Sequence, residues 1–168
     1  MVNPLLVNAA ELLRRPGTEK PIALRPTVSE LGITDSRLPG NGQVDIALRL
    51  ESMSDGVVVD GQIHVPWAAS CRRCLEPAVG VTVSEVHELY QSAVTDPDAS
   101  PIVGDQIDLR PLVHDLALLD APLAALCMPE CAGLCPVCGC NRNTHPCRCD
   151  TATADPRWAG LDGLQLDG

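Results

Sequence analysis

The chain has 168 residues and a formal net charge of −10, with no phenylalanine, one tyrosine and two tryptophans. This length allows one domain with a core and a small appendage, and the core must consist of aliphatic side chains. An acidic chain with so few aromatic platforms is poorly suited to grip bare RNA. No apolar run approaches the roughly 18 residues of a membrane span, and no basic region precedes the short N-terminal apolar run. We therefore expect a cytoplasmic protein without a signal peptide.

The first 42 residues predict short elements and a long connection. Residues 2–7 form a short apolar run that predicts a strand. Asn8 then predicts the N-cap of a helix that Pro16-Gly17 must end. Residues 21–27 predict an edge strand, because the proline within them cannot donate to a sheet ladder. Residues 28–42 carry repeated glycine and proline, which is typical of an irregular connection.

From residue 43, apolar side chains recur at every second position, and this alternation predicts a sheet. Residues 44–51 alternate apolar and polar side chains, and residues 57–67 resume the pattern after a turn signal, so the two stretches predict a hairpin. A third strand is expected over residues 79–90. The sequence thus predicts an antiparallel β-meander, with Cys71-Arg-Arg-Cys74 at the tip of a strand–turn–strand unit.

Residues 109–120 show the clearest helical spacing of apolar side chains, with Asp108 as the expected N-cap. The polar residues 91–101 before this helix predict a mobile loop. Asp155-Pro156 predicts the start of a short last helix. The expected fold is α+β, with an antiparallel β-meander core, two or three short helices and a cysteine-rich tail.

Seven of the nine cysteines lie between residues 127 and 149. Cys135-Pro-Val-Cys138 followed by Gly139 is typical of a zinc knuckle, because two thiolates at this spacing reach one tetrahedral metal and the glycine can turn backbone N–H groups toward sulfur. A disulfide framework and a redox pair are the alternatives. We interpret the tail as zinc-binding and divide the chain into a core domain, 1–126, and a zinc tail with a short terminal helix, 127–168.

One zinc ion needs four ligands from this region. We assign Cys131, Cys135, Cys138 and Cys149, with Cys147 as the main alternative for the last place. The other alternative ligands are Cys127, Cys71 and Cys74. Cys140 is left out because it follows Gly139 so closely that its side chain is expected to point away. A closed set of four thiolates leaves no position for water, so the site is predicted to be structural.

The pair Cys71 and Cys74 has three interpretations: a metal site, a structural turn, or a redox pair. Arg72 and Arg73 between them would favour the thiolate form. No further ligand lies nearby in sequence, which weighs against metal. The same two arginines form the densest positive charge in the middle of the chain and are candidates for contact with a partner.

Residues 85–130 carry nine acidic side chains against Arg110 alone. Such a segment would attract a basic partner and repel phosphate, although it could also be a solvated face. The sequence contains no nucleophile elbow, Walker sequence, dinucleotide fingerprint or HExxH, and its four histidines form no ligand pattern. We therefore expect a protein that is not an enzyme.

Several separated motifs together resemble the YceD family, the large ribosomal RNA subunit accumulation proteins of bacteria and plastids. They are Cys71-Arg-Arg-Cys-Leu-Glu-Pro, Ile107-Asp-Leu before the helix, Cys127-x3-Cys131-Ala-Gly-Leu-Cys135-Pro-Val-Cys138-Gly, and Cys147-Arg-Cys149 ahead of Asp155-Pro-Arg-Trp. The family's knuckle is usually followed by Gly-x-Asn-Leu-Asn. Here Cys140 occupies the variable place, which supports leaving it out of the metal site.

The resemblance implies a role in the synthesis, processing or stability of 23S ribosomal RNA, with the large ribosomal subunit precursor as partner, through a ribosomal protein, the RNA or both. Because the chain is acidic, we expect contact with a basic ribosomal protein more than with naked RNA. Two alternatives remain: an RNA-binding module, and a thiol oxidoreductase that uses Cys71 and Cys74.

Overall fold

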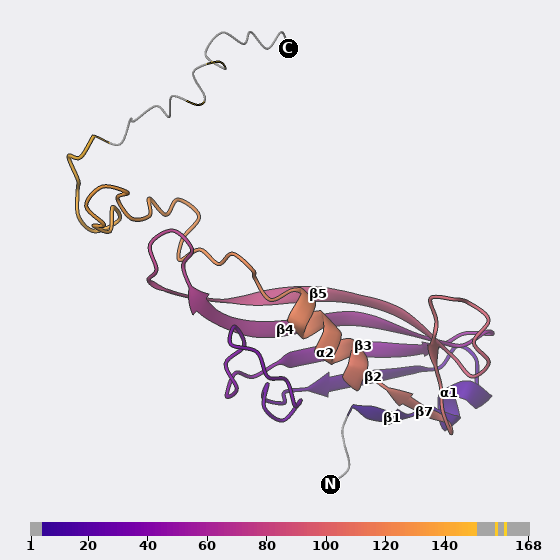
Figure 1. Ribbon diagram of the computed structural model, residues 1–168. Helices are drawn as coiled ribbons and strands as arrows, with labels where there is room; N and C mark the ends of the chain where they lie inside the picture. The colour runs from indigo at the N-terminus through magenta and orange to yellow at the C-terminus, as the bar shows by residue number, and fades with distance from the viewer. Residues whose placement is uncertain (1–4, 151–156, 158–159, 161–168) are drawn as a thin grey trace.

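The computed structural model describes residues 5–150, 157 and 160. Figure 1 shows a long sheet with one helix lying across a face of it and the cysteine-rich segment at one end. The predicted last helix after Asp155 lies outside the described residues. Within the described ranges, no helix is long and apolar enough to cross a membrane.

The main sheet has five strands in the order β2-β3-β4-β5-β6. Their bounds are Glu19–Leu24 (β2), Asp45–Ser52 (β3), Val57–Ser70 (β4), Pro77–Gln91 (β5) and Ser100–Pro101 (β6). The pairs from β2 to β5 are antiparallel, which confirms the predicted meander, with β2 at the edge. The short β6 is parallel to β5 and makes the sheet mixed. Part of the predicted loop over residues 91–101 is therefore a strand.

A small second sheet consists of the two strands that lead into the helices. Strand β1 (Leu6–Asn8) pairs antiparallel with β7 (Gln106–Asp108). Each strand leads into a helix: β1 into α1 (Ala10–Arg14), and β7 into α2 (Arg110–Leu119). The sequence patterns predicted both helices because their apolar residues recur at helical spacing.

The predicted N-caps, Asn8 and Asp108, are wrong by one residue. The caps are Ala9 and Leu109, because Asn8 and Asp108 are still extended as the last residues of β1 and β7. Both side chains nevertheless serve the helices. The Asn8 Oδ1 accepts the backbone N–H of Ala10 at 2.9 Å, and the Asp108 Oδ1 accepts that of Arg110 at 3.0 Å. Each bond satisfies one of the N–H groups that a helix start leaves unpaired.

The core lies between one face of the main sheet and the layer formed by the helices and the small sheet. Alternation along β3 buries Ile46, Leu48 and Leu50, and α2 adds Val113 and Ala117 to the same cluster. Full burial of an aliphatic side chain of this size contributes about 1.5–3 kcal/mol. The aliphatic core predicted from the composition is therefore the main support of the sheet.

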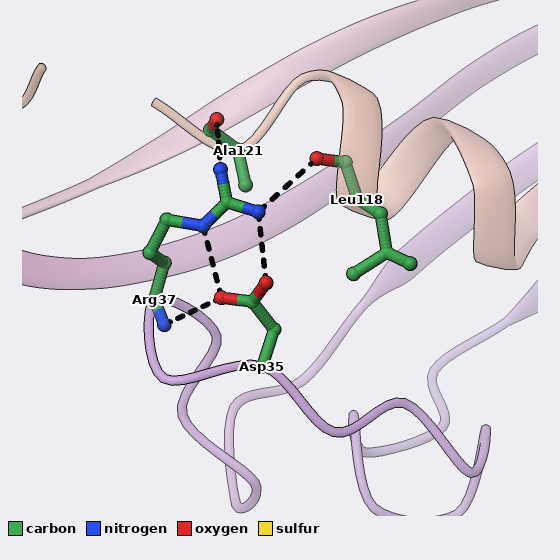
Figure 2. Close-up of polar contacts among 4 residues, drawn as sticks. All are labelled: Asp35, Arg37, Leu118 and Ala121. Carbon is green, nitrogen blue, oxygen red and sulfur yellow. Dashed lines mark hydrogen bonds and ion pairs between the residues drawn. The ribbon is translucent and has the colours of Figure 1, made fainter. Parts of the chain in front are cut away.

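Arg37 fastens the end of α2 to the connection between β2 and β3 (Figure 2). Its guanidinium donates to the carbonyl oxygens of Ala121 at 2.9 Å and Leu118 at 3.4 Å, so it satisfies carbonyl groups that the helix end leaves free. Asp35 holds the same guanidinium through both carboxylate oxygens, at 2.9 and 2.8 Å. The hydrogen bonds from Arg37 lower the pKa of Asp35 to about 2. This connection thereby fixes where the chain leaves α2.

The β4–β5 hairpin extends beyond its neighbour β3. Strand β3 pairs with β4 only as far as His64, whereas β4 and β5 remain paired to Ser70 and Pro77. The projecting end carries the turn at residues 71–76, and the segment after α2 runs to it (Figure 1). The hairpin tip and that segment together position the cysteines.

Candidate metal centres

The first cysteine group joins the hairpin tip to the segment that follows α2. It consists of Cys71, Cys74, Cys127 and Cys131, whose Sγ atoms all lie within 4.8 Å of one another. Three of these side chains are buried, and Cys127 is half-buried. Ala78 and Ala125 are buried in the same cluster. The site therefore lies inside a small secondary core.

Main-chain hydrogen bonds hold the two parts of this group together. The backbone N–H of Arg72 donates to the Ala125 carbonyl at 2.9 Å, and the N–H of Leu134 donates to the Arg73 carbonyl at 2.9 Å. The Arg73 guanidinium donates to the Cys131 carbonyl, also at 2.9 Å. Hence the tip and the tail are in contact on both sides of the cysteines.

The second cysteine group lies within the tail. It consists of Cys135, Cys138, Cys147 and Cys149, with all Sγ atoms again within 4.8 Å of one another. Cys135 is buried, Cys138 is exposed, and the other two are half-buried. This group is thus local in sequence and more open to water than the first.

Both groups contain the same knuckle. In the first, the N–H of Leu75 donates to the Cys71 carbonyl at 2.9 Å, and in the second the N–H of Gly139 donates to the Cys135 carbonyl at 2.9 Å. The residue after the second cysteine has a positive φ in both: 64° at Leu75 and 72° at Gly139. This backbone turn directs N–H groups at the first sulfur of each pair.

The distances between the sulfur atoms fit tetrahedral coordination of one metal ion in each group. A regular tetrahedron with metal–sulfur bonds of about 2.3 Å has edges of about 3.8 Å. The Sγ atoms of Cys71 and Cys131 are 3.7 Å apart, and those of Cys74 and Cys127 are 3.5 Å apart. In the second group the Sγ atom of Cys147 lies 3.6 Å from that of Cys138 and 3.3 Å from that of Cys135. All nine cysteines are free thiols. Both groups can therefore hold a metal ion.

Backbone N–H groups favour the thiolate at the first cysteine of each knuckle. Burial alone would raise the pKa of Cys71, but hydrogen bonds from the backbone of Cys127, Cys74 and Arg73 outweigh it and lower this pKa to about 6. Backbone hydrogen bonds from Cys138 and Val137 lower the pKa of Cys135, likewise to about 6. The donors at Cys71 are main-chain groups, whereas the sequence had suggested the charges of Arg72 and Arg73.

Other thiols in the groups have raised pKa values because neighbouring sulfur atoms lie close to them. The contact with Cys74 raises the pKa of Cys127 to about 12, and the contact with Cys147 raises that of Cys149 to about 12. Several adjacent thiolates repel one another unless a cation lies between them. A divalent cation would remove this repulsion and displace the remaining thiol protons.

Asn143 connects the two groups. Its amide Nδ2 donates to the Cys131 Sγ at 3.3 Å and to the Asn141 Oδ1 at 2.8 Å. Its Oδ1 accepts the backbone N–H of Ala132 at 2.8 Å. Asn143 belongs to the loop of the second group, so it couples that loop to a ligand of the first.

The set assigned from sequence is not one group in the structure. Cys135, Cys138 and Cys149 lie together, but Cys131 lies with Cys71, Cys74 and Cys127, and Cys147 takes the fourth place in the second group. The tail therefore does not complete its site with Cys131. The alternatives Cys127, Cys147, Cys71 and Cys74 all fall within one of the two groups, while Cys140 and His145 fall in neither.

The remaining candidate residues lie on different surfaces. Arg72 and Arg73 are both exposed at the tip, although the Arg73 guanidinium also holds the Cys131 carbonyl. The acidic segment 85–130 does not form a single face. Asp120 accepts a hydrogen bond from the Ser84 hydroxyl, whereas Asp108 and Asp115 border a groove beside α2.

Fold and site define an α+β protein with two four-cysteine groups that can hold metal. The chain matches the model of the family described as large ribosomal RNA subunit accumulation protein YceD over residues 59–165, and it belongs to that family. The matched residues include the hairpin tip and every cysteine of both groups. The resemblance noted in the sequence is confirmed.

Similar proteins occur in mycobacteria and in Zea mays. An uncharacterized protein of Mycobacterium tuberculosis is 33% identical over 171 residues, covering 96% of this chain and 81% of that protein. One of Mycobacterium leprae is 30% identical over 174 residues, covering 98% and 79%. The Zea mays protein named large ribosomal RNA subunit accumulation protein YCED homolog 1, chloroplastic, is 40% identical over 50 residues, covering 29% and 17%. No solved structure gives a significant match.

Proposed function

We propose that this protein is a non-enzymatic factor that supports the synthesis, processing or stability of 23S ribosomal RNA during large-subunit assembly in the cytoplasm. The observation that carries the proposal is its membership of a family described by large ribosomal RNA subunit accumulation. The partner is a precursor of the large ribosomal subunit, reached through a ribosomal protein, the RNA or both.

Zinc is the metal that suits both cysteine groups. Sulfur-only, four-coordinate tetrahedral sites are typical of structural zinc. In each group four thiols surround one point, so a bound ion would have no open position for water or substrate. This supports a structural role and weighs against metal catalysis. The ligands would be Cys71, Cys74, Cys127 and Cys131 for one ion, and Cys135, Cys138, Cys147 and Cys149 for the other.

The two alternatives have less support. A thiol oxidoreductase needs an accessible thiol, but Cys71 has 0% exposed surface and Cys74 has 3%. An RNA-binding module usually offers exposed aromatic side chains or a basic stripe. Among the described residues Tyr90 is buried, Trp67 is half-buried, and the net charge of the chain is −10. Contact through a protein component of the precursor is therefore favoured.

The proposal is tested by depleting the protein in its own cells and measuring the ratio of 23S to 16S ribosomal RNA together with sucrose-gradient profiles. Depletion should lower the ratio and reduce the large-subunit peak. The wild-type chain and Cys140→Ser should restore both, because Cys140 lies outside the two groups. Cys74→Ser should restore neither. An unchanged ratio and profile after depletion would rule the proposed function out.

A further inference from the structure

A groove of about 820 Å³ lies between β5, β7 and α2, and no cysteine lines it. Three acidic residues line it: Glu88 from β5, Asp108 from β7 and Asp115 from α2. Arg110 also lines it, but it is already bound to Asp108 by an ion pair of 2.5 Å. The lining therefore has an excess of negative charge. Asp115, whose Oδ1 lies 3.2 Å from the Nδ1 of its neighbour His114, has a side chain that is 70% exposed.

The floor of the groove contains a polar group without a partner. Tyr90 is only 4% exposed and lines the groove, yet its hydroxyl has no hydrogen bond to any described residue. No fully buried side-chain oxygen or nitrogen in the described part of the chain lacks a partner. The Tyr90 hydroxyl must therefore reach the open space of the groove. A tyrosine this deeply buried usually finds a partner for its hydroxyl, and here only water or an occupant of the groove can supply it.

The acidic residues act on this hydroxyl. Burial, together with the nearby negative charges of Glu88 and Asp108, raises the pKa of Tyr90 to about 12. The hydroxyl thus stays neutral next to carboxylates, where it can accept a hydrogen bond from a cationic donor.

Apolar side chains complete the lining. Leu112 and Leu116 of α2 face the groove, and at its rim Leu119 is 77% exposed and Val103 is 71% exposed. An occupant that covers them must carry apolar groups next to its positive charge. A small inorganic cation would leave these side chains in water, and a nucleic acid would bring phosphate close to Glu88 and Asp115.

We propose that this groove binds a basic peptide segment of a protein partner, with an arginine side chain placed between Glu88, Asp115 and the Tyr90 hydroxyl and with neighbouring apolar residues over Leu116 and Leu119. A guanidinium suits the site because it offers five N–H donors to carboxylate and hydroxyl oxygens. The inference rests on the proposed function for the source of the peptide, which would be a basic component of the ribosomal precursor.

The test uses the full-length, zinc-loaded protein and a fluorescent ten-residue peptide of alternating arginine and leucine, with binding measured by anisotropy. Glu88→Gln combined with Asp115→Asn should weaken peptide binding about tenfold in Kd, because two exposed ion pairs to the arginine are lost. Tyr90→Phe should weaken it by a smaller factor, about threefold, through loss of one hydrogen bond. Raised salt should weaken binding to the wild type more than to the double variant.

The matched control is Glu85→Gln with Glu130→Gln. This pair removes the same charge, but Glu85 lies on the opposite face of β5 and Glu130 lies outside the groove. Its Kd should equal that of the wild type. A peptide with citrulline in place of arginine should lose binding, because citrulline keeps the shape and lacks the charge. Thermal unfolding of every variant shows whether the fold is intact.

Three outcomes would overturn the inference. The first is that Glu85→Gln with Glu130→Gln weakens peptide binding as much as Glu88→Gln with Asp115→Asn does. The second is that the citrulline peptide binds as tightly as the arginine peptide. The third is that a ten-nucleotide RNA binds more tightly than the peptide and loses this binding in the groove variant. Failure here is distinguishable from failure of the proposed function. If the peptide does not bind while the protein still restores the 23S to 16S ratio, only the groove is wrong. If the peptide binds while depletion leaves that ratio unchanged, only the ribosomal role is wrong.

Discussion

The two cysteine groups share a knuckle but differ in how the chain closes them. In the first group, the Cys71 and Cys131 sulfurs come from positions 60 residues apart, and the site packs into a secondary core with Ala78 and Ala125. The second group closes within residues 135–149 and includes the exposed Cys138. An ion in the first group would cross-link two distant parts of the fold, whereas an ion in the second would organise its own loop, which reaches the first group through Asn143. Metal binding would thus stabilise tertiary structure at the first group and mainly local structure at the second.

The largest expected effect, and the clearest test that the two groups bind metal independently, comes from removing one ligand from each group. Cys74→Ser and Cys138→Ser should each lower the zinc content from about two ions per chain to about one. Structural zinc contributes on the order of 10 kcal/mol to such sites. Hydrogen exchange should show the difference: Cys74→Ser should expose residues 71–76 and 125–134, while Cys138→Ser should expose residues 135–149 and the Ala132 N–H that Asn143 holds, but not the hairpin tip.

Cys140→Ser is the control for these variants, because its sulfur belongs to neither group. It should keep two zinc ions and the wild-type exchange pattern. The strands of the main sheet should stay protected in all three proteins, since their core does not include the cysteines. Loss of protection at the hairpin tip in Cys138→Ser would contradict the separation of the groups.

The pH dependence of zinc affinity should be alike in the two groups. Zinc displaces the protons that its thiols still carry, so affinity falls as the pH falls. In each group one thiol with a pKa of about 12, Cys127 or Cys149, carries its proton throughout the neutral range. The pKa of Cys71 and of Cys135 is lowered to about 6, so these thiols add a further proton only below that pH. The slope of affinity against pH should therefore steepen below about pH 6.

Cys138→Ser retains only the first group and Cys74→Ser only the second, so a competition titration with a chelator measures each group separately. A constant slope from pH 8 to pH 5 in either variant would show that the backbone N–H groups of that knuckle do not favour its thiolate.

The hydrogen bonds of Asn143, which link the two groups, should contribute less free energy than zinc binding at either group. Asn143→Ala removes the hydrogen bond to the Cys131 Sγ and the acceptor for the Ala132 N–H, and should cost about 1–2 kcal/mol of unfolding free energy in the tail. Asn143→Asp keeps an acceptor for Ala132 but places a carboxylate beside a thiolate. It should therefore weaken zinc binding at the first group more than Asn143→Ala does. Equal zinc affinity in both variants would mean that the amide does not support Cys131.

The sheet could be predicted from the sequence because its signals are local. Period-two alternation identified β3, β4 and β5, and helical spacing identified α2. The knuckle at Cys135 was also readable, since CxxC-Gly contains the whole turn. The short parallel β6 was not, because two residues, Ser100 and Pro101, carry no periodic signal.

The partners of Cys71 and Cys74 could not be found from neighbouring sequence. Their approach to Cys127 depends on how far the β4–β5 hairpin extends past β3, and on the direction in which the chain leaves α2, which Arg37 fixes. One signal was available. With Cys140 set aside, eight cysteines remain in two CxxC pairs and two further pairs, which equals two complete sets of four.

The smallest expected effect concerns the residue that follows the second cysteine of each knuckle. Leu75 has a φ of 64°, and Gly139 has a φ of 72° at the equivalent place. A residue with a side chain pays roughly 1–2 kcal/mol in this region, which glycine avoids. Leu75 is 65% exposed, so its side chain contributes little packing in return. Leu75→Gly should therefore raise the unfolding free energy of the tip by about 1 kcal/mol. Gly139→Ala should lower that of the second group by about the same amount, although its added Cβ would meet nothing within 4 Å. Chelator titration and thermal unfolding of both variants measure the two shifts. If Leu75→Gly were destabilising, the greater backbone entropy of glycine in the unfolded chain and the lost packing of the Leu75 side chain would outweigh the strain at its positive φ.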